Sequence, residues 1–311
     1  MAAIPEELNI SKGTKHQAMV KVKGTGLSMP FSIITGHKDG PTVFVTTGIH
    51  GSEYPGTLAM IELLQEFTPD IVQGRLMAIH PVNTMAFEAR LSMIFPEDGH
   101  NLNRVFPGKP DGLASERVAW HITELQDMAD FYLDLHSGDL YEELTPYVYF
   151  PGKGDETVIE ASRKAAACLN LPFMVRSSST TGAYNSAALR GTPSLLIERG
   201  GAGNCLREEV DFYKKDLINI FRHLNLLPGE PDKPGQPPAE LENVIYLEAE
   251  QAAVWRCFIR AGDKVTTGQL LGELLDPFGR VLKTFAAERD GIVLYRLGTL
   301  SSNFGDVLVA Y

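Results

Sequence analysis

Short runs of β-branched and aromatic residues alternate with helix-like patterns along the first two-thirds of the chain. Behind Pro55, the apolar residues Leu58, Ile61 and Leu64 recur at helical spacing and predict a helix with one core-facing side. Pro55 suits the first turn of that helix because its missing N–H would be unpaired there anyway. Strands that alternate with helices predict an α/β/α layered domain with a largely parallel or mixed sheet.

The same patterns place the individual elements. We expect helices to begin near Pro55, Ser115, Asp155, Thr181 and Arg207. We expect strands at Met19–Val22, Phe31–Thr35, Thr42–Thr46, Arg75–His80, Phe131–Leu135, Tyr147–Phe150, Phe173–Val175 and Ser194–Ile197.

A proline-rich segment, residues 226–238, interrupts this alternation. Its prolines cannot sustain a helix or a central strand, so the segment is typical of a linker. Beyond it, many short strands separated by Gly and Asp turns predict a small β-sandwich or barrel. We therefore divide the chain into an α/β domain at 1–228, a linker at 229–240 and a C-terminal β domain at 241–311.

Composition narrows the class of partner. The 311 residues include 28 Lys and Arg against 39 Asp and Glu, a formal net charge of −11, which disfavours nucleic acid as a partner. A small anionic substrate remains allowed because a pocket sets its own local potential. Three separated cysteines without a CxxC pair fit a reducing compartment. The N-terminal residues lack a signal peptide's apolar run, and no stretch suits a membrane helix, so we expect a cytoplasmic protein.

The first motif that carries chemistry, GIHGSE, directly follows the hydrophobic run TVFVT. In open α/β sheets the carboxyl ends of strands face the ligand crevice, so a site is expected there. His50 and Glu53, three residues apart, can place an imidazole nitrogen and a carboxylate oxygen on one metal ion. By itself this spacing is common, and it also fits a surface histidine beside a solvated glutamate.

Two further strand ends favour the metal site. The buried strand FYLDL delivers His136 at its C-terminal tip, and two histidines with one glutamate make the ligand set of a catalytic zinc. The strand SLLI ends in Glu198, a carboxylate that is costly to bury without a task or a partner. Beside a zinc-activated water, Glu198 can act as general base and then return the proton to a leaving amine. The alternative is a surface pair with Arg199, although neighbours in a strand point to opposite faces.

A fourth motif, DGHNLNRVFPG, supplies Asn103 and Arg104. An amide and a planar guanidinium are suited to binding a carboxylate. Taken alone, the same arginine also fits a structural salt bridge in a loop.

Four motifs follow one another along the chain: GIHGSEYPG, DGHNLNRVFPG, DLHSG and LIERGG. In this order they resemble the succinylglutamate desuccinylase/aspartoacylase family of the zinc-carboxypeptidase-like superfamily. The match runs from about Thr35 to Gly203, with a weaker continuation to the C-terminus. It implies a three-layer α/β/α zinc-hydrolase domain with a mixed sheet, followed by a small β domain. It also implies a zinc-dependent amidohydrolase that removes an acetyl or succinyl group from an N-acyl amino acid. By position, one zinc ion per chain would be bound by His50, Glu53 and His136, the base would be Glu198, and the substrate carboxylate would contact Asn103 and Arg104.

The chain departs from the family at one position. Family members usually carry an arginine shortly before a Pro-x-Asp-Gly stretch, where it polarises the scissile carbonyl. Here Met93 stands at that offset from Pro96, with Arg90 three residues earlier. A three-residue insertion after Ser92 would let Arg90 keep the role, so we expect Arg90 to stabilise the oxyanion.

The C-terminal segment resembles a barrel-sandwich domain of the biotinyl/lipoyl type. A carrier needs a lysine at the hairpin tip, which Glu288–Gly291 does not offer, and Lys283 lies too early. We therefore expect this domain to be a lid, a substrate wall or an oligomer contact, and a homo-oligomer is plausible. Alternatives to a deacylase are a metallocarboxypeptidase with an open cleft, a non-catalytic metal-binding scaffold and a biotin- or lipoate-dependent carrier.

Overall fold

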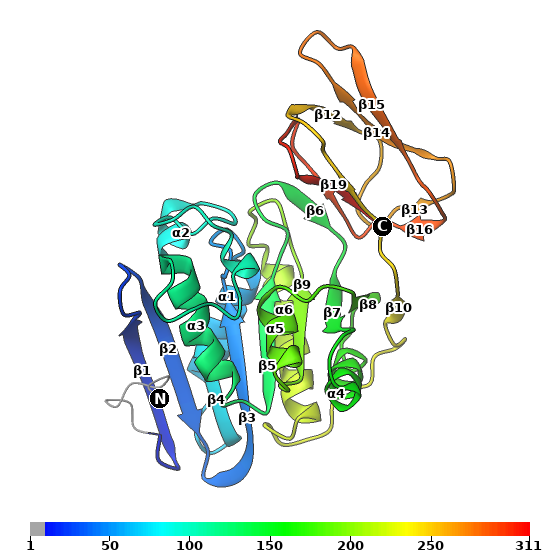
Figure 1. Ribbon diagram of the computed structural model, residues 1–311. Helices are drawn as coiled ribbons and strands as arrows, with labels where there is room; N and C mark the ends of the chain where they lie inside the picture. Colours follow the sequence, from blue (N-terminus) through cyan, green and yellow to red (C-terminus); the bar gives the residue numbers. More distant parts are fainter. Residues whose placement is uncertain (1–9) are drawn as a thin grey trace.

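A nine-stranded sheet forms the centre of the protein, which we describe from a computed structural model over residues 10–311 (Figure 1). The expectation of no signal peptide concerns residues that lie in part outside this range. The strand order is β1-β2-β4-β3-β5-β9-β7-β8-β10. In chain order the strands are β1 (Thr14–Lys21), β2 (Ser28–Thr35), β3 (Lys38–Thr47), β4 (Gln73–Ile79), β5 (Phe131–His136), β7 (Tyr147–Pro151), β8 (Phe173–Ser177), β9 (Ser194–Glu198) and β10 (Ala239–Leu241).

The sheet is mixed, with its parallel part in the middle. Strands β4, β3, β5 and β9 run parallel to one another, whereas β2 and β7 flank them in the antiparallel direction. Every residue of β5 is buried, as expected of a central strand that is covered on both faces. The carboxyl ends of β3, β5 and β9 therefore meet at one edge of the sheet.

Helices cover both faces of the sheet. The buried faces of α1, α4 and α6 share one hydrophobic core, and those of α3 and α5 share a second core on the opposite face (Figure 1). The helices are α1 (Pro55–Glu66), α2 (Thr84–Ala89), α3 (Ala114–Gln126), α4 (Glu156–Ala166), α5 (Ala183–Leu189) and α6 (Arg207–His223), with a short 3-10 helix η1 (Leu102–Arg104). This architecture confirms the predicted α/β/α layers with a mixed sheet. Every expected strand is present, and the expected helices begin within a few residues of their predicted starts.

The C-terminal part contains only strands. Its strands form a sheet β11-β19-β17-β6, which includes β6 (Glu142–Leu144) from earlier in the chain, a second four-stranded sheet β15-β14-β12-β18 and a two-stranded sheet β13-β16. The strands are β11 (Tyr246–Glu248), β12 (Ala253–Cys257), β13 (Lys264–Val265), β14 (Leu270–Leu275), β15 (Val281–Ala286), β16 (Gly291–Ile292), β17 (Tyr295–Leu297), β18 (Ser301–Ser302) and β19 (Val307–Ala310). This all-β part confirms the second half of the predicted fold.

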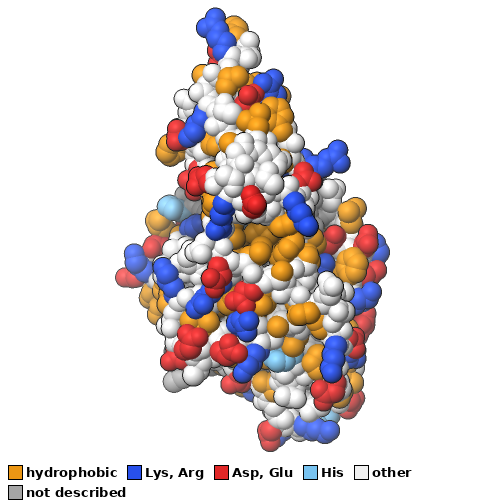
Figure 2. Space-filling model, turned by 90° about the vertical axis from the view of Figure 1, so that its right-hand side faces the viewer, with side chains coloured by type: hydrophobic (Ala, Val, Ile, Leu, Met, Phe, Trp, Pro, Cys, Tyr) orange, Lys and Arg blue, Asp and Glu red, His pale blue; other side chains and the backbone are white. Residues whose placement is uncertain are grey.

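The two parts exchange strands. Strand β6 (Glu142–Leu144) follows β5 in the chain but pairs with β17 of the C-terminal part. Conversely, β10 follows the proline-rich segment and extends the large sheet by pairing with β8. A small apolar cluster that includes Tyr147, Val175 and Leu294 packs where the parts meet. In Figure 2 the narrower C-terminal part stands on the broader α/β part. The domain limits drawn from the sequence stay a prediction.

No helix within residues 10–311 combines the length and the apolar character that crossing a membrane requires.

Candidate active site and metal centre

The loop between β3 and α1 brings His50 and Glu53 to the carboxyl edge of the sheet. Two glycines let this loop fold tightly. Gly48 has φ +60°, a left-handed conformation that favours glycine. A Cβ on Gly51 would lie only 2.4 Å from the carbonyl carbon of Ala86. The two glycines of the motif therefore allow the close backbone packing that turns both side chains into the site.

Neighbouring strands deliver His136 and Glu198. His136 is the last residue of β5, Glu198 is the last residue of β9, and the two residues are paired in register. His50, Glu53 and His136 are buried, with at most 7% of their surface exposed. The structure thus brings together side chains that are far apart in the sequence, as the positions of the strand ends predict.

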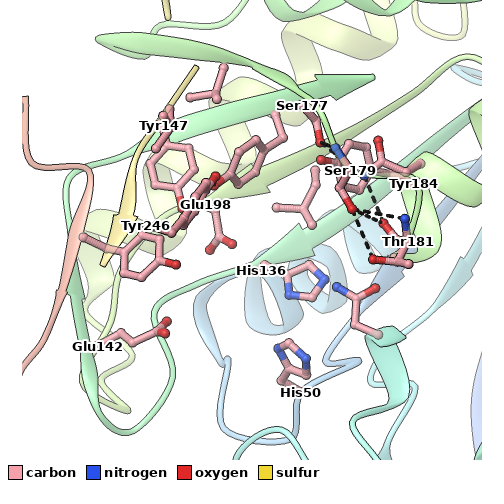
Figure 3. A pocket seen from close by; sticks show the side chains of 18 of the residues that line it. His50, His136, Glu142, Tyr147, Ser177, Ser179, Thr181, Tyr184, Glu198 and Tyr246 are labelled. Carbon is pink, nitrogen blue, oxygen red and sulfur yellow. Dashed lines mark hydrogen bonds between the residues drawn. The ribbon is translucent and has the colours of Figure 1, made fainter. Parts of the chain in front are cut away.

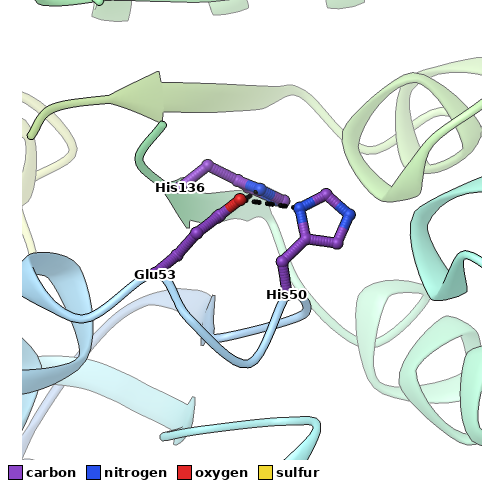
Figure 4. A group of neighbouring side chains, drawn as sticks. All are labelled: His50, Glu53 and His136. Carbon is purple, nitrogen blue, oxygen red and sulfur yellow. Dashed lines mark hydrogen bonds and ion pairs between the residues drawn. The ribbon is translucent and has the colours of Figure 1, made fainter. Parts of the chain in front are cut away.

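The Glu53 carboxylate lies between the two imidazoles (Figure 4). Its Oε1 is 2.7 Å from His50 Nδ1, and its Oε2 is 2.8 Å from His136 Nδ1. One ligand atom from each residue lies within 4.8 Å of the others. This group could hold a metal ion.

The far nitrogen of each ring faces an oxygen atom. His50 Nε2 is hydrogen-bonded to Asn101 Oδ1 at 3.1 Å, and His136 Nε2 lies 3.0 Å from Asp134 Oδ2 as an ion pair without hydrogen-bond geometry. Thr46 donates a 2.8 Å hydrogen bond to Asp134 Oδ1 and so fixes that carboxylate. An oxygen atom this close to Nε2 favours the proton on that nitrogen and leaves Nδ1 as the ligand atom. These contacts are typical of metal-binding histidines, and the donor set of two nitrogens and one carboxylate fits zinc.

The charges in this group favour a bound cation. Burial raises the pKa of Glu53, but the His136 and His50 imidazoles outweigh it and hold this pKa at about 2. Burial lowers the pKa of His136, yet the Asp134 and Glu53 carboxylates raise it well above its usual value. The carboxylates thus hold positive charge at this position, which is the requirement of a cation site.

Glu198 lies beside this group with an unsatisfied oxygen. Its Oε2 is buried and has no hydrogen-bond partner among the described residues. Burial raises the pKa of Glu198 well above its ordinary value, and the charge of Glu53 raises it further. In Figure 3 the Glu198 carboxylate points into the space that His136 and His50 face. A buried carboxylate with a free oxygen in this position can exchange a proton with a molecule in the pocket.

A cavity of about 320 Å³ joins these residues to Asn103 and Arg104. Asn103 is buried in η1, and its Oδ1 accepts a 2.8 Å hydrogen bond from the N–H of Ala183. This bond orients the amide and leaves its NH₂ group as a donor for the cavity. Arg104 is exposed at the end of η1 and also lines the cavity.

Arg90 lies apart from these residues. It is exposed at the C-cap of α2, with φ 55°, and it is not among the residues that line the cavity. Met93 does line the cavity. The role of Arg90 in stabilising an oxyanion stays a prediction.

Several lining residues were missed by the sequence analysis. The C-terminal part contributes Tyr246 and Tyr295, and the OH of Tyr246 is 2.9 Å from the OH of Tyr149. Glu142 of β6 also lines the cavity. Asp134 was also missed, although it does not line the cavity. Among these residues it is the one with a signal in the sequence, because alternation along β5 puts it on the same face as His136.

Comparisons with known proteins agree with this architecture. The model of the family "Succinylglutamate desuccinylase/Aspartoacylase catalytic domain" matches residues 39–224. The N-alpha-acetyl-L-2,4-diaminobutyric acid deacetylase of Halomonas elongata is 31% identical over 281 residues, which cover 87% of this chain and 81% of the relative. The solved structure of the ectoine utilization protein EutE (DoeB) from Ruegeria pomeroyi has a TM-score of 0.87 at 26% identity, covering 97% of this chain and 96% of the other. The succinylglutamatedesuccinylase/aspartoacylase from Rhodobacter sphaeroides has a TM-score of 0.85 at 25% identity, covering 99% and 98%.

Proposed function

Because the chain belongs to the succinylglutamate desuccinylase/aspartoacylase family, as the motif resemblance predicted, we propose that it is a zinc-dependent deacylase of N-acyl amino acids. The acyl group would be of the acetyl or succinyl type, as the names of its relatives suggest. The observation that carries this proposal is the juxtaposition of Glu198, with its free buried oxygen, and the His50–Glu53–His136 group.

In this proposal one zinc ion is held by His50, Glu53 and His136. Bound zinc supplies a Lewis acid that makes water more acidic and polarises a carbonyl oxygen. Asp134 and Asn101 keep the two rings oriented through their Nε2 atoms.

Glu198 is the proposed proton carrier. Its free Oε2 accepts a proton from the attacking water and returns it to the amine nitrogen that leaves the amide. The proton is therefore conserved, and the products are a short carboxylic acid and a free amino acid.

Asn103 and Arg104 are the proposed carboxylate binders. The NH₂ group of Asn103 and the guanidinium of Arg104 line the same cavity as the metal group, and both can donate to the substrate's α-carboxylate. We retain Arg90 as the proposed donor to the developing oxyanion, which requires its loop to turn toward the cavity.

The shape of the cavity supports a small substrate over a peptide. Tyr246 and Tyr295 of the C-terminal part close one side of it, whereas a metallocarboxypeptidase that acts on peptides needs an open cleft. We keep a cytoplasmic location and a homo-oligomer as predictions from the sequence.

The proposal is tested with Glu198→Gln. We expect this variant to lose about 10²- to 10⁴-fold in kcat on an N-acyl amino acid while it retains its zinc, measured by elemental analysis. Glu209→Gln is a matched control, because Glu209 also has a buried, unpartnered oxygen but does not line the cavity. Full activity of Glu198→Gln would remove Glu198 from the base role. Zinc-loaded protein without any hydrolase activity would instead support a non-catalytic scaffold.

A further inference from the structure

Glu142 is a carboxylate in the cavity without a cationic ion-pair partner among residues 10–311. Within the described part of the chain, its side chain forms no ion pair, whereas its neighbour Glu143 pairs with Arg296 of β17. Alternation along β6 accounts for the difference, because adjacent side chains of a strand point to opposite faces. In Figure 3 the Glu142 carboxylate points into the space shared by His50, His136 and Tyr246.

The other lining carboxylates have tasks or partners. Asp139 accepts hydrogen bonds from the Ser92 hydroxyl and from the backbone N–H of Tyr141. Glu53 lies between the two imidazoles. Glu198 has the buried free oxygen that the proposed proton transfer uses. Glu142 has the backbone N–H of Asp139 as a partner, but among the lining carboxylates of the described residues it is the one with neither a cationic partner nor a proposed role.

Negative charge outweighs positive charge around Glu142. Burial raises its pKa to about 8 and the Asp139 and Glu53 carboxylates add to the rise, whereas the backbone N–H of Asp139 and the Arg104 guanidinium lower it. Arg176, the other lining arginine, lies 3.8 Å from Glu242 and is directed to that carboxylate. A pKa of about 8 leaves Glu142 largely protonated at neutral pH when no cation is bound beside it. A cation that enters the cavity lowers this pKa and stabilises the ionised carboxylate.

The walls next to Glu142 also suit a cation. Tyr295, Tyr246 and Tyr147 line the same cavity. Tyrosine rings present a negative face that attracts ammonium groups. An acidic group framed by aromatic rings is therefore favourable for an organic amine and unfavourable for a second carboxylate.

Resting on the deacylase function proposed above, we infer that Glu142 is a specificity-determining residue that binds a cationic amine on the substrate's side chain. The preferred substrates are then Nα-acyl diamino acids. Arg104 and Glu142 line one cavity, and a bound ammonium group favours the ionised form of Glu142, so the two residues match a ligand with an α-carboxylate at one end and an ammonium group at the other. An N-acyl glutamate or aspartate would instead place its side-chain carboxylate beside Glu142, where like charges repel.

Two substrates of equal shape test this assignment. The side chains of Nα-acetyl-L-2,4-diaminobutyrate and Nα-acetyl-L-norvaline differ only in an ammonium group against a methyl group. We expect the wild-type protein to prefer the diamino substrate by about 10- to 100-fold in kcat/KM, the value of a charged hydrogen bond. In Glu142→Gln we expect this preference to fall to within about threefold of parity, through loss on the cationic substrate alone.

Glu143→Gln is the matched control on the same strand, because Glu143 faces away from the cavity and pairs with Arg296. It should keep the preference intact. Equal turnover of both substrates by the wild type, or an unchanged preference in Glu142→Gln, would overturn the inference. The comparison of the two substrates on the wild-type protein tests the inference even if a variant fails to fold.

A binding measurement separates this inference from the proposed function. Calorimetric titration with the free amino acids 2,4-diaminobutyrate and norvaline needs no turnover. If the protein hydrolyses neither acetylated substrate but binds diaminobutyrate more tightly in a Glu142-dependent way, the deacylase proposal fails and the amine site stands. If it hydrolyses N-acyl amino acids with no preference for the amine, the deacylase proposal stands and the amine site fails.

Discussion

Replacing Asp134 with Asn should weaken metal binding without touching any ligand atom. Asp134 is fully buried, its Oδ2 lies 3.0 Å from His136 Nε2, and Thr46 holds its other oxygen. An asparagine with its carbonyl toward Thr46 presents an NH₂ group to Nε2, which must then accept. The proton on His136 moves to Nδ1, the atom that faces Glu53 and the metal position.

The expected size follows from that change of tautomer. A metal ion must displace the Nδ1 proton or rotate the asparagine, and either step reduces its affinity. Loss of such outer contacts typically costs 10- to 100-fold in metal affinity, which corresponds to about 1.4–2.8 kcal/mol. Asp134→Asn should affect His136 more than His50, because the Nε2 atom of His50 is bonded to Asn101, a neutral acceptor at 3.1 Å that the substitution leaves in place.

Competition between the protein and a fluorescent zinc chelator measures the affinity directly. Asp139→Asn serves as the control, since Asp139 lines the cavity but bonds to Ser92 and Tyr141 and not to either histidine. We expect Asp139→Asn to stay within about threefold of the wild type. A folded Asp134→Asn protein with wild-type zinc affinity would refute the argument that Asp134 sets the tautomer of His136.

The remaining predictions concern stability. Burial lowers the pKa of His80 to about 4, so its contribution, up to about 3 kcal/mol, is present above pH 6.5 and is lost as the pH falls toward 4. Between pH 7 and pH 4.5, the free energy of unfolding measured with urea should fall less for His80→Gln than for the wild type, and an equal fall would refute this. Arg199→Met should cost about 3–5 kcal/mol, because it leaves Asp216 as a buried charge without its 2.6 Å partner. Arg207→Met, which breaks an exposed pair with Glu62, should cost about 1 kcal/mol or less; equal losses for both variants would contradict the burial argument.

The proximity of the candidate metal ligands was predictable because strand ends are local signals. His50, His136 and Glu198 each follow a short apolar run, and parallel strands place their carboxyl ends at the same edge. No knowledge of the strand order was needed to expect them together. The layered fold was predictable in the same way, because strand-like and helix-like patterns of apolar residues alternate along the chain.

The walls of the cavity were not predictable from such signals. Glu142 enters through β6, a strand of three residues that exists because it pairs with β17, more than a hundred residues later in the chain. Tyr246 and Tyr295 depend equally on how the C-terminal part docks. Helix α2, with six residues, was also missed, because it is too short to show a helical period.

The exchange of strands gives the C-terminal part a role in selecting the substrate. Strand β6 is held by β17, and the Glu143–Arg296 ion pair joins the same two strands from the side opposite to Glu142. A shift of β6 by one residue would exchange the two carboxylates, because each step along a strand reverses the face. Glu142 therefore points into the cavity only while β6 keeps its register with β17. The residues that we propose as metal ligands lie at the carboxyl edge of the large sheet, whereas the residue that we assign to the substrate's amine is positioned by the C-terminal sheet. Chemistry and specificity can therefore vary independently in this fold.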